Sequence, residues 1–89
     1  MEQKHKRLEE LKEKAFNDVL ETIKPGNEYY QGKEDDYWHK VTKITKARVY
    51  YVSYFYGYNG KPTESGEKYE SHSQFVTAIQ SGYYREKED

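Results

Sequence analysis

The sequence has no cysteine, only one methionine and only two prolines among its 89 residues. The absence of cysteine excludes disulfide bonds, thiolate-ligated zinc and a cysteine nucleophile. Aliphatic residues are also scarce, because leucine, isoleucine and valine together with phenylalanine number 14. Such a shortage is typical of disordered chains only when the net charge is high. Here 15 basic residues stand against 16 acidic ones, so a folded chain is expected.

Tyrosine supplies the missing apolar mass. The chain has 11 tyrosines, one tryptophan and three phenylalanines, and each aromatic side chain buries about 150–250 Å². We therefore expect a single tyrosine-rich domain over residues 1–89. The longest uncharged run, residues 49–60, is too short to span a bilayer, and the charged start of the chain has no apolar signal segment. We expect a cytoplasmic protein with no membrane partner.

Residues 1–24 have the pattern of an amphipathic helix. Apolar residues recur there at three- and four-residue steps, at Leu8, Leu11, Ala15, Val19 and Ile23. Pro25 and Gly26 then supply the usual signals for the end of a helix. A coiled coil is the alternative, but a strict heptad would place Asp18 at an apolar position. The pattern therefore favours packing of this helix on the chain's own sheet.

Residues 27–84 change to a β pattern. Strands are expected at 28–31, 37–44, 48–56 and 67–70, with a short helix at 72–81 whose capping box is Ser71 and Gln74. Tyr83 and Tyr84 are expected to add a last strand, before a mobile charged tail at 85–89. The fold class is α+β, with a long N-terminal helix and an antiparallel sheet of three to five strands. We expect this sheet to curl into a partly closed SH3-like barrel, which removes exposed edges.

Two segments of the β-rich part carry a resemblance. Residues 37–51 read YWHKVTKITKARVYY, and residues 73–83 read SQFVTAIQSGY. In these segments the chain resembles small SH3-like barrel accessory proteins encoded by bacteriophages, over about half of its length. The resemblance implies a phage-type accessory protein that acts by binding, and it implies no particular activity.

The strand expected at 48–56 has aromatic residues on both of its faces. Strict alternation places four tyrosines on one face, with the last just beyond the strand: Tyr50, Tyr54, Tyr56 and Tyr58. Either both faces are buried, or this row of tyrosines is an exposed contact surface. Tyrosine suits a contact surface because it is rigid, largely apolar and polar at its tip. The four tyrosines are therefore the candidate partner-binding residues.

A basic hairpin precedes this row. Between residues 39 and 48 the chain carries four cations and no acid, beside Trp38: Lys40, Lys43, Lys46 and Arg48. Cations interleaved with aromatic rings on a sheet are what single-stranded nucleic acid needs, for its phosphates and its bases. Strict alternation, however, divides Lys43 from Lys40 unless a bulge intervenes, and the net charge of −1 is a second objection. Solvated lysines on an edge hairpin are the alternative.

No motif indicates catalysis or metal binding. The acidic run 34–36 lacks the alternating ligands of a calcium loop, and no spacing brings His39 and His72 together. The serines lack a nucleophile elbow, and the glycines form no phosphate loop. We therefore expect a non-enzymatic protein with no cofactor and no metal.

Three functions remain. The first is a binding module that inhibits or adapts a larger host or phage protein through the tyrosines. The second is a nucleic-acid-binding barrel that uses the basic and aromatic hairpin. The third is a nucleotide-sequestering protein, which requires a pocket. The sequence leaves open whether the chain is a monomer or a homodimer.

Overall fold

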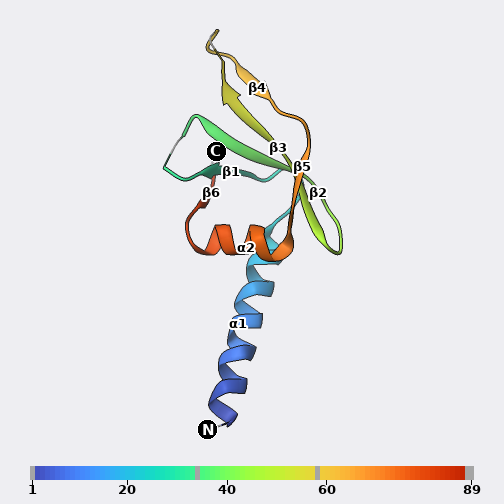
Figure 1. The fold of residues 1–89 in the computed structure, drawn as a ribbon, viewed down its shortest axis with the longest axis vertical. Helices are drawn as coiled ribbons and strands as arrows, with labels where there is room; N and C mark the ends of the chain where they lie inside the picture. Colours follow the sequence, from blue (N-terminus) through green and yellow to red (C-terminus); the bar gives the residue numbers. More distant parts are fainter. Residues whose placement is uncertain (1, 34, 58, 88–89) are drawn as a thin grey trace.

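The computed structural model describes residues 2–33, 35–57 and 59–87, with side chains from residue 8 onward. This part of the chain forms two helices and six strands in one antiparallel sheet, which confirms the α+β class (Figure 1). In chain order the elements are α1 (Glu2–Thr22), β1 (Glu28–Gln31), β2 (Tyr37–Ile44), β3 (Arg48–Tyr56), β4 (Pro62–Glu64), β5 (Lys68–Ser71), α2 (His72–Gln80) and β6 (Tyr84–Glu86).

The sheet is open. Its order is β4-β3-β2-β1-β6, and β5 also pairs with β3. The long strand β3 pairs with β5 along its first half and with β4 along its last residues. Between them the Ser65 amide donates to the Ser53 carbonyl at 2.8 Å, so β4 and β5 share one edge of β3. With β6 at the opposite end, the edges do not meet, and the partly closed SH3-like barrel that we expected is not confirmed.

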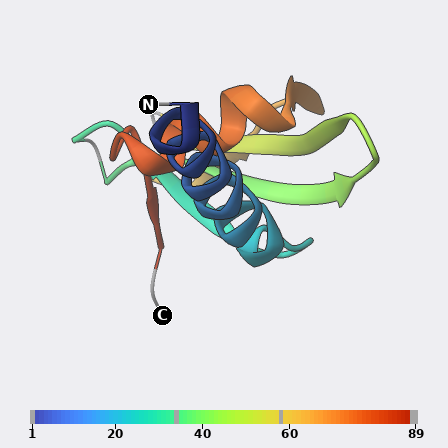
Figure 2. The same ribbon diagram turned by 90° about the horizontal axis from the view of Figure 1, so that it is seen from below.

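Both helices lie on the same side of the sheet (Figures 1 and 2). On that side Phe75 of α2 is fully buried, with its ring centroid 5.5 Å from that of Tyr29 and 4.9 Å from that of Tyr84. The core cluster also contains Ile23 at the end of α1 and Val49 of β3. Helix α2 begins with the expected capping box, in which Ser71 and Gln74 each bond the other's backbone amide.

Helix α1 projects beyond the sheet and gives the molecule extents of 60 × 26 × 19 Å (Figure 1). Only its last turns reach the core, through partly buried residues such as Phe16 and Leu20. Leu8 and Leu11 are more than half exposed, so the expectation that they lie on a buried face is wrong. The sheet and α2 are too small to extend beneath them. Neither helix of the described part is long and apolar enough to cross a membrane.

The mobile tail expected from residue 85 onward is wrong for its first residues. Tyr84–Glu86 is strand β6, in which Glu86 pairs with Tyr29 and Arg85 pairs with Tyr30 of β1. The Lys87 amide also donates to the Glu28 carbonyl at 2.8 Å, which extends the pairing by one residue. The free edge of β1 provides these backbone partners. Residues 88 and 89 lie outside the described residues.

Candidate functional site

The side chains of strand β3 point alternately to the two faces of the sheet, one packed against the helices and one not covered by them. Val49, Tyr51 and Ser53 point to the helices and are buried. Tyr50 and Tyr54 alternate with them on the opposite side, which neither helix covers. We call this opposite side the helix-free face. By strand position and ring contacts it carries Tyr30, Trp38, Lys40, Lys43, Arg48, Tyr50, Val52, Tyr54, Tyr56, Tyr69, Arg85 and Lys87.

A β-bulge in β2 unites the basic residues. Val41 pairs with Tyr51, and Lys43 pairs with Tyr50, so Thr42 is an extra residue without a partner in the ladder. The bulge returns Lys43 to the same face as Lys40. Its ammonium lies 4.7 Å from the centroid of the Tyr50 ring. The division of the basic patch that strict alternation predicts therefore does not occur.

Trp38 lies at the centre of the helix-free face and supports the tyrosines. Its ring stacks on Tyr54, with centroids 5.6 Å apart and planes at 17°, and it contacts the ring of Tyr56 at 5.5 Å. The Lys87 ammonium lies 4.1 Å from the Trp38 ring. Trp38 is only 6% exposed, whereas Tyr56 is 52% exposed. The tryptophan that we predicted as a contact residue is therefore a buried support, and the tyrosines above it are the accessible rings.

Cations lie over rings at both ends of the face. At one corner the rings of Tyr50 and Tyr69 are 5.8 Å apart, and the Arg48 guanidinium lies 4.3 Å from the Tyr69 centroid. At the other end Arg85 and Lys87 lie 5.4 and 5.7 Å from the ring of Tyr30. All five ring–cation contacts found among the described residues are on this face. Such pairs hold the long basic side chains against the sheet.

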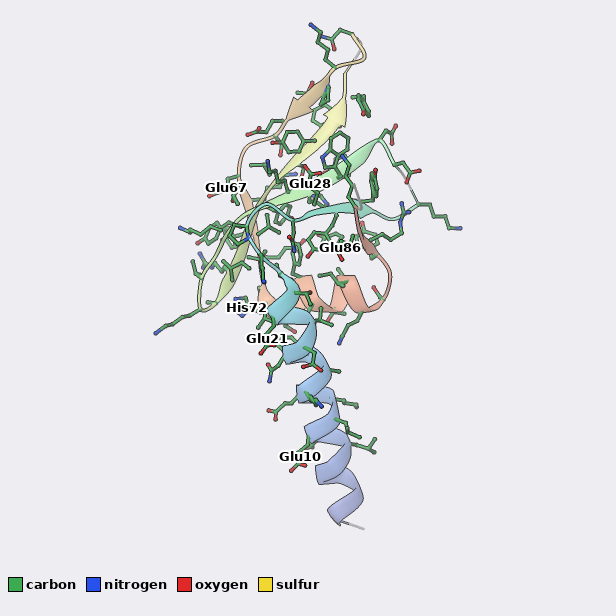
Figure 3. The ribbon with its side chains drawn as sticks, turned by 180° about the vertical axis from the view of Figure 1, so that it is seen from behind. Glu10, Glu21, Glu28, Glu67, His72 and Glu86 are labelled. Atoms are coloured by element: carbon green, nitrogen blue, oxygen red, sulfur yellow. The ribbon has the colours of Figure 1, made fainter. Side chains whose placement is uncertain are left out.

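The helix-free face is more basic than the whole chain. Its five cations stand beside two carboxylates, Glu28 and Glu64, which are also placed there by strand register. Glu28 forms an ion pair with Lys87 at 3.5 Å. Glu64 accepts the Tyr54 hydroxyl at 2.9 Å, which raises the pKa of Tyr54 above its ordinary value. Asp35 adds a third carboxylate at the edge of the face, through an ion pair with Arg85 at 3.1 Å, whereas Glu10 lies far out on α1 (Figure 3).

The structure brings together most of the residues that the sequence singled out. Tyr50, Tyr54, Tyr56, Lys40, Lys43 and Arg48 share the helix-free face. Lys46 is exposed in the turn between β2 and β3, and Tyr58 lies outside the described residues. Sequence reasoning missed four members of the face: Tyr30, Tyr69, Arg85 and Lys87. The alternation of Tyr69 with Lys68 and Glu70 was an available signal, but no signal placed Arg85 and Lys87 beside β1.

His39 is buried on the core face and is not available for chemistry. Its Nδ1 lies 2.7 Å from Ser53 Oγ, and its Nε2 lies 2.7 Å from Gln31 Oε1. With Gln31 Oε1 as an acceptor, Nε2 carries the proton, and Nδ1 accepts from the Ser53 hydroxyl. Burial lowers the pKa of His39 to about 4, and the Lys68 ammonium adds to this effect. Ser53 is fully buried, so the pair is structural and not a nucleophile with its base.

The metal site and the nucleotide pocket that the sequence raised as alternatives gain no support from the described residues. Within the described ranges no three His, Asp or Glu side chains are placed to hold a metal ion. His72 instead contacts the Thr45 carbonyl through Nε2 at 2.7 Å. One open hollow runs along α1 beside Glu13 and Phe16, and another lies near Gly32 and Tyr83. Neither is lined by the tyrosine row, so these hollows give no support to the nucleotide-sequestering hypothesis.

Searches against protein-family models, curated proteins and solved structures gave no match. The function must therefore be argued from the geometry of the site alone.

Proposed function

We propose that this chain is a non-enzymatic binding module whose helix-free face binds single-stranded nucleic acid. The observation that carries the proposal is the bulge in β2, which aligns Lys43 with Lys40 beside the tyrosines of β3. Single strands expose their bases, which stack on aromatic rings, and their phosphates, which pair with lysine and arginine. An uncovered sheet face offers both kinds of contact over several strands.

The face is also ordered before binding. Tyr54 stacks on the buried Trp38, and Arg48 and Lys43 already lie over tyrosine rings. Side chains that are fixed in the free protein lose less conformational entropy when a ligand binds. The exposed rings of Tyr56 and Tyr69 are then the surfaces on which bases stack.

A charge-reversal experiment tests this proposal. The double variant Lys43→Glu/Arg48→Glu changes two exposed cations of the face, and Lys12→Glu/Lys14→Glu makes the same change in net charge on the exposed part of α1. The affinity for a fluorescent single-stranded oligonucleotide is measured by anisotropy, with a melting curve for each variant. We expect at least a tenfold loss for the first variant and little change for the second. Equal losses, or no binding by the wild-type protein, would refute the proposal.

A second candidate function is binding to a larger protein, as the bacteriophage resemblance implies for an inhibitor or adaptor. The end of β3 (Tyr54–Tyr56) and its partner β4 (Pro62–Glu64) form an arm that extends beyond the rest of the sheet (Figure 1). It exposes aromatic rings on both sides, with Phe55 40% exposed on the core side and Tyr56 52% exposed on the helix-free side. A single-stranded nucleic acid bound to the helix-free face would contact Tyr56 but not Phe55. Exposed aromatic rings on two sides of an arm are suited to a protein partner that contacts the arm from both sides.

A photo-crosslinking amino acid in place of Phe55 tests this second candidate. A protein partner would give one discrete adduct in host cells, and adding Tyr56→Ala would abolish it. Phe55→Ser should meanwhile leave the affinity for the oligonucleotide unchanged, because Phe55 lies on the other side of the sheet. Absence of a discrete adduct would contradict the protein-binding candidate, without bearing on the nucleic-acid proposal.

A further inference from the structure

Strand β5 is an open edge of the sheet. Lys68–Ser71 pairs with β3 along one side, and no other strand of the described residues pairs with its outer side. The backbone N–H and C=O groups of an edge strand that point outward are a template for another strand. Tyr69 of this strand is exposed and belongs to the helix-free face.

The side chains of β5 complement a second copy of the same strand. In an antiparallel pair centred on Tyr69, Lys68 of each copy lies opposite Glu70 of the other. Opposite charges at facing positions stabilise a strand pair. Centring the pair on Lys68 or on Glu70 would instead place like charges opposite each other. A shift by one residue would separate the charges and turn each side chain to the wrong face.

Glu70 is already fixed at this edge. Its Oε1 accepts the hydroxyl of Tyr84 at 2.7 Å and that of Tyr51 at 3.1 Å. These bonds come from the core side of the sheet, the side on which Lys68 also lies because it alternates with Tyr69. The carboxylate is therefore positioned before any partner arrives.

We propose that β5 pairs antiparallel with β5 of a second copy, with Tyr69 on the two-fold axis, to form a homodimer with a continuous sheet. Such an interface is isologous, so each Lys68–Glu70 contact occurs twice. The dimer places the two helix-free faces side by side, with the Arg48 and Tyr69 corner of each copy at the junction. The inference does not depend on what those faces bind.

Cysteine crosslinking tests the register directly, because the natural chain contains no cysteine. Residues on the axis of an antiparallel pair have Cα atoms about 4.5–5.5 Å apart, which is within the range that a disulfide spans. Tyr69→Cys should therefore form a covalent dimer under mild oxidation, whereas Lys61→Cys in the exposed β3–β4 loop should not. Equal crosslinking of both variants would overturn the proposal.

Light scattering on the full chain provides the second measurement. At high concentration we expect a mass of twice 10.7 kDa. Lys68→Glu should raise the dissociation constant about tenfold or more, because it places two carboxylates opposite each other at both ends of the pair. Lys61→Glu makes the same charge change elsewhere and should leave the dimer intact. A wild-type protein that is monomeric at every concentration, or a dimer indifferent to Lys68→Glu, would overturn the proposal. If this edge instead pairs with a strand of another protein, the chain on its own would be monomeric, and the homodimer proposal would be overturned in the same way.

Discussion

At the scale of single residues, His39 shows how a buried polar group is accommodated in this sheet. Ser53 and Gln31 each contact one of its ring nitrogens at 2.7 Å. Rings of Tyr51 and Tyr84 pack around it, with centroids 4.9 and 5.1 Å away. A neutral imidazole satisfies these contacts, whereas a charged one would lack water and lie near Lys68.

Acid should therefore destabilise the fold through His39. Its pKa is about 4 in the folded chain against 6.5 for an ordinary histidine, so the unfolded state binds more protons. The free energy of unfolding should fall by about 3 kcal/mol as the pH drops from 6.5 to 4. Urea titrations across this pH range measure the fall. His39→Gln serves as the control: it should be less stable at pH 7 but should lack this part of the slope. An identical slope in both proteins would contradict the account.

Trp38 and Tyr56 should respond differently to truncation, because one is buried and the other exposed. Trp38→Ala should cost about 3–5 kcal/mol of stability. Tyr56→Ala should cost only about 1 kcal/mol of stability, yet weaken oligonucleotide binding by about 1–3 kcal/mol. Thermal melts and anisotropy titrations separate the two effects. Unfolding of the Tyr56→Ala protein would show that this ring is part of the core and not a contact residue.

At the scale of elements, the local signals were the reliable ones. The capping box and the two long strands follow from spacing and residue type, and the structure contains each of them. The last strand was expected at Tyr83 and Tyr84 but is Tyr84–Glu86, so its position was predicted only in part. Tertiary distances could not be predicted in the same way. The stripe of Leu8 and Leu11 predicts a buried face, but burial requires a neighbour, and the sheet does not extend that far.

The candidate site was predictable in composition but not in assembly. The tyrosines and the basic hairpin were identified from alternation alone. Lys43 shares a face with Lys40 only because Thr42 is an extra residue in β2. The Thr42 hydroxyl donates to Glu67 at 2.8 Å, a partner 25 residues away. The placement of Arg85 and Lys87 depends on pairing between strands from opposite ends of the β-rich part. Neither long-range contact leaves a local pattern.

The capping box at the start of α2 should contribute measurably to stability. Ser71→Ala removes the acceptor for the Gln74 amide, so the free energy of unfolding should fall by about 1 kcal/mol. Ser73→Ala changes a neighbouring exposed serine inside the helix and should alter the stability by less than about 0.5 kcal/mol. Chemical denaturation of the three proteins measures both values. Equal losses in the two variants would show that the cap does not stabilise α2.

At the scale of the whole molecule, charge is distributed unevenly. The net charge of −1 argues against a nucleic-acid-binding protein when it is read as a single number. The sheet, however, separates one face with five cations and six aromatic rings from the helices on the other side. A binding partner meets the local potential of this face and not the average over the chain.

The salt dependence of oligonucleotide binding is the measurement that tests this central claim most directly. On single strands the slope of log K against log salt is about −0.7 for each phosphate that is neutralised. The wild-type protein should therefore lose affinity steeply as salt is added, and Lys43→Glu/Arg48→Glu should reduce the magnitude of the slope by about 1.4 or more. A slope near zero, or the same slope in both proteins, would contradict the account.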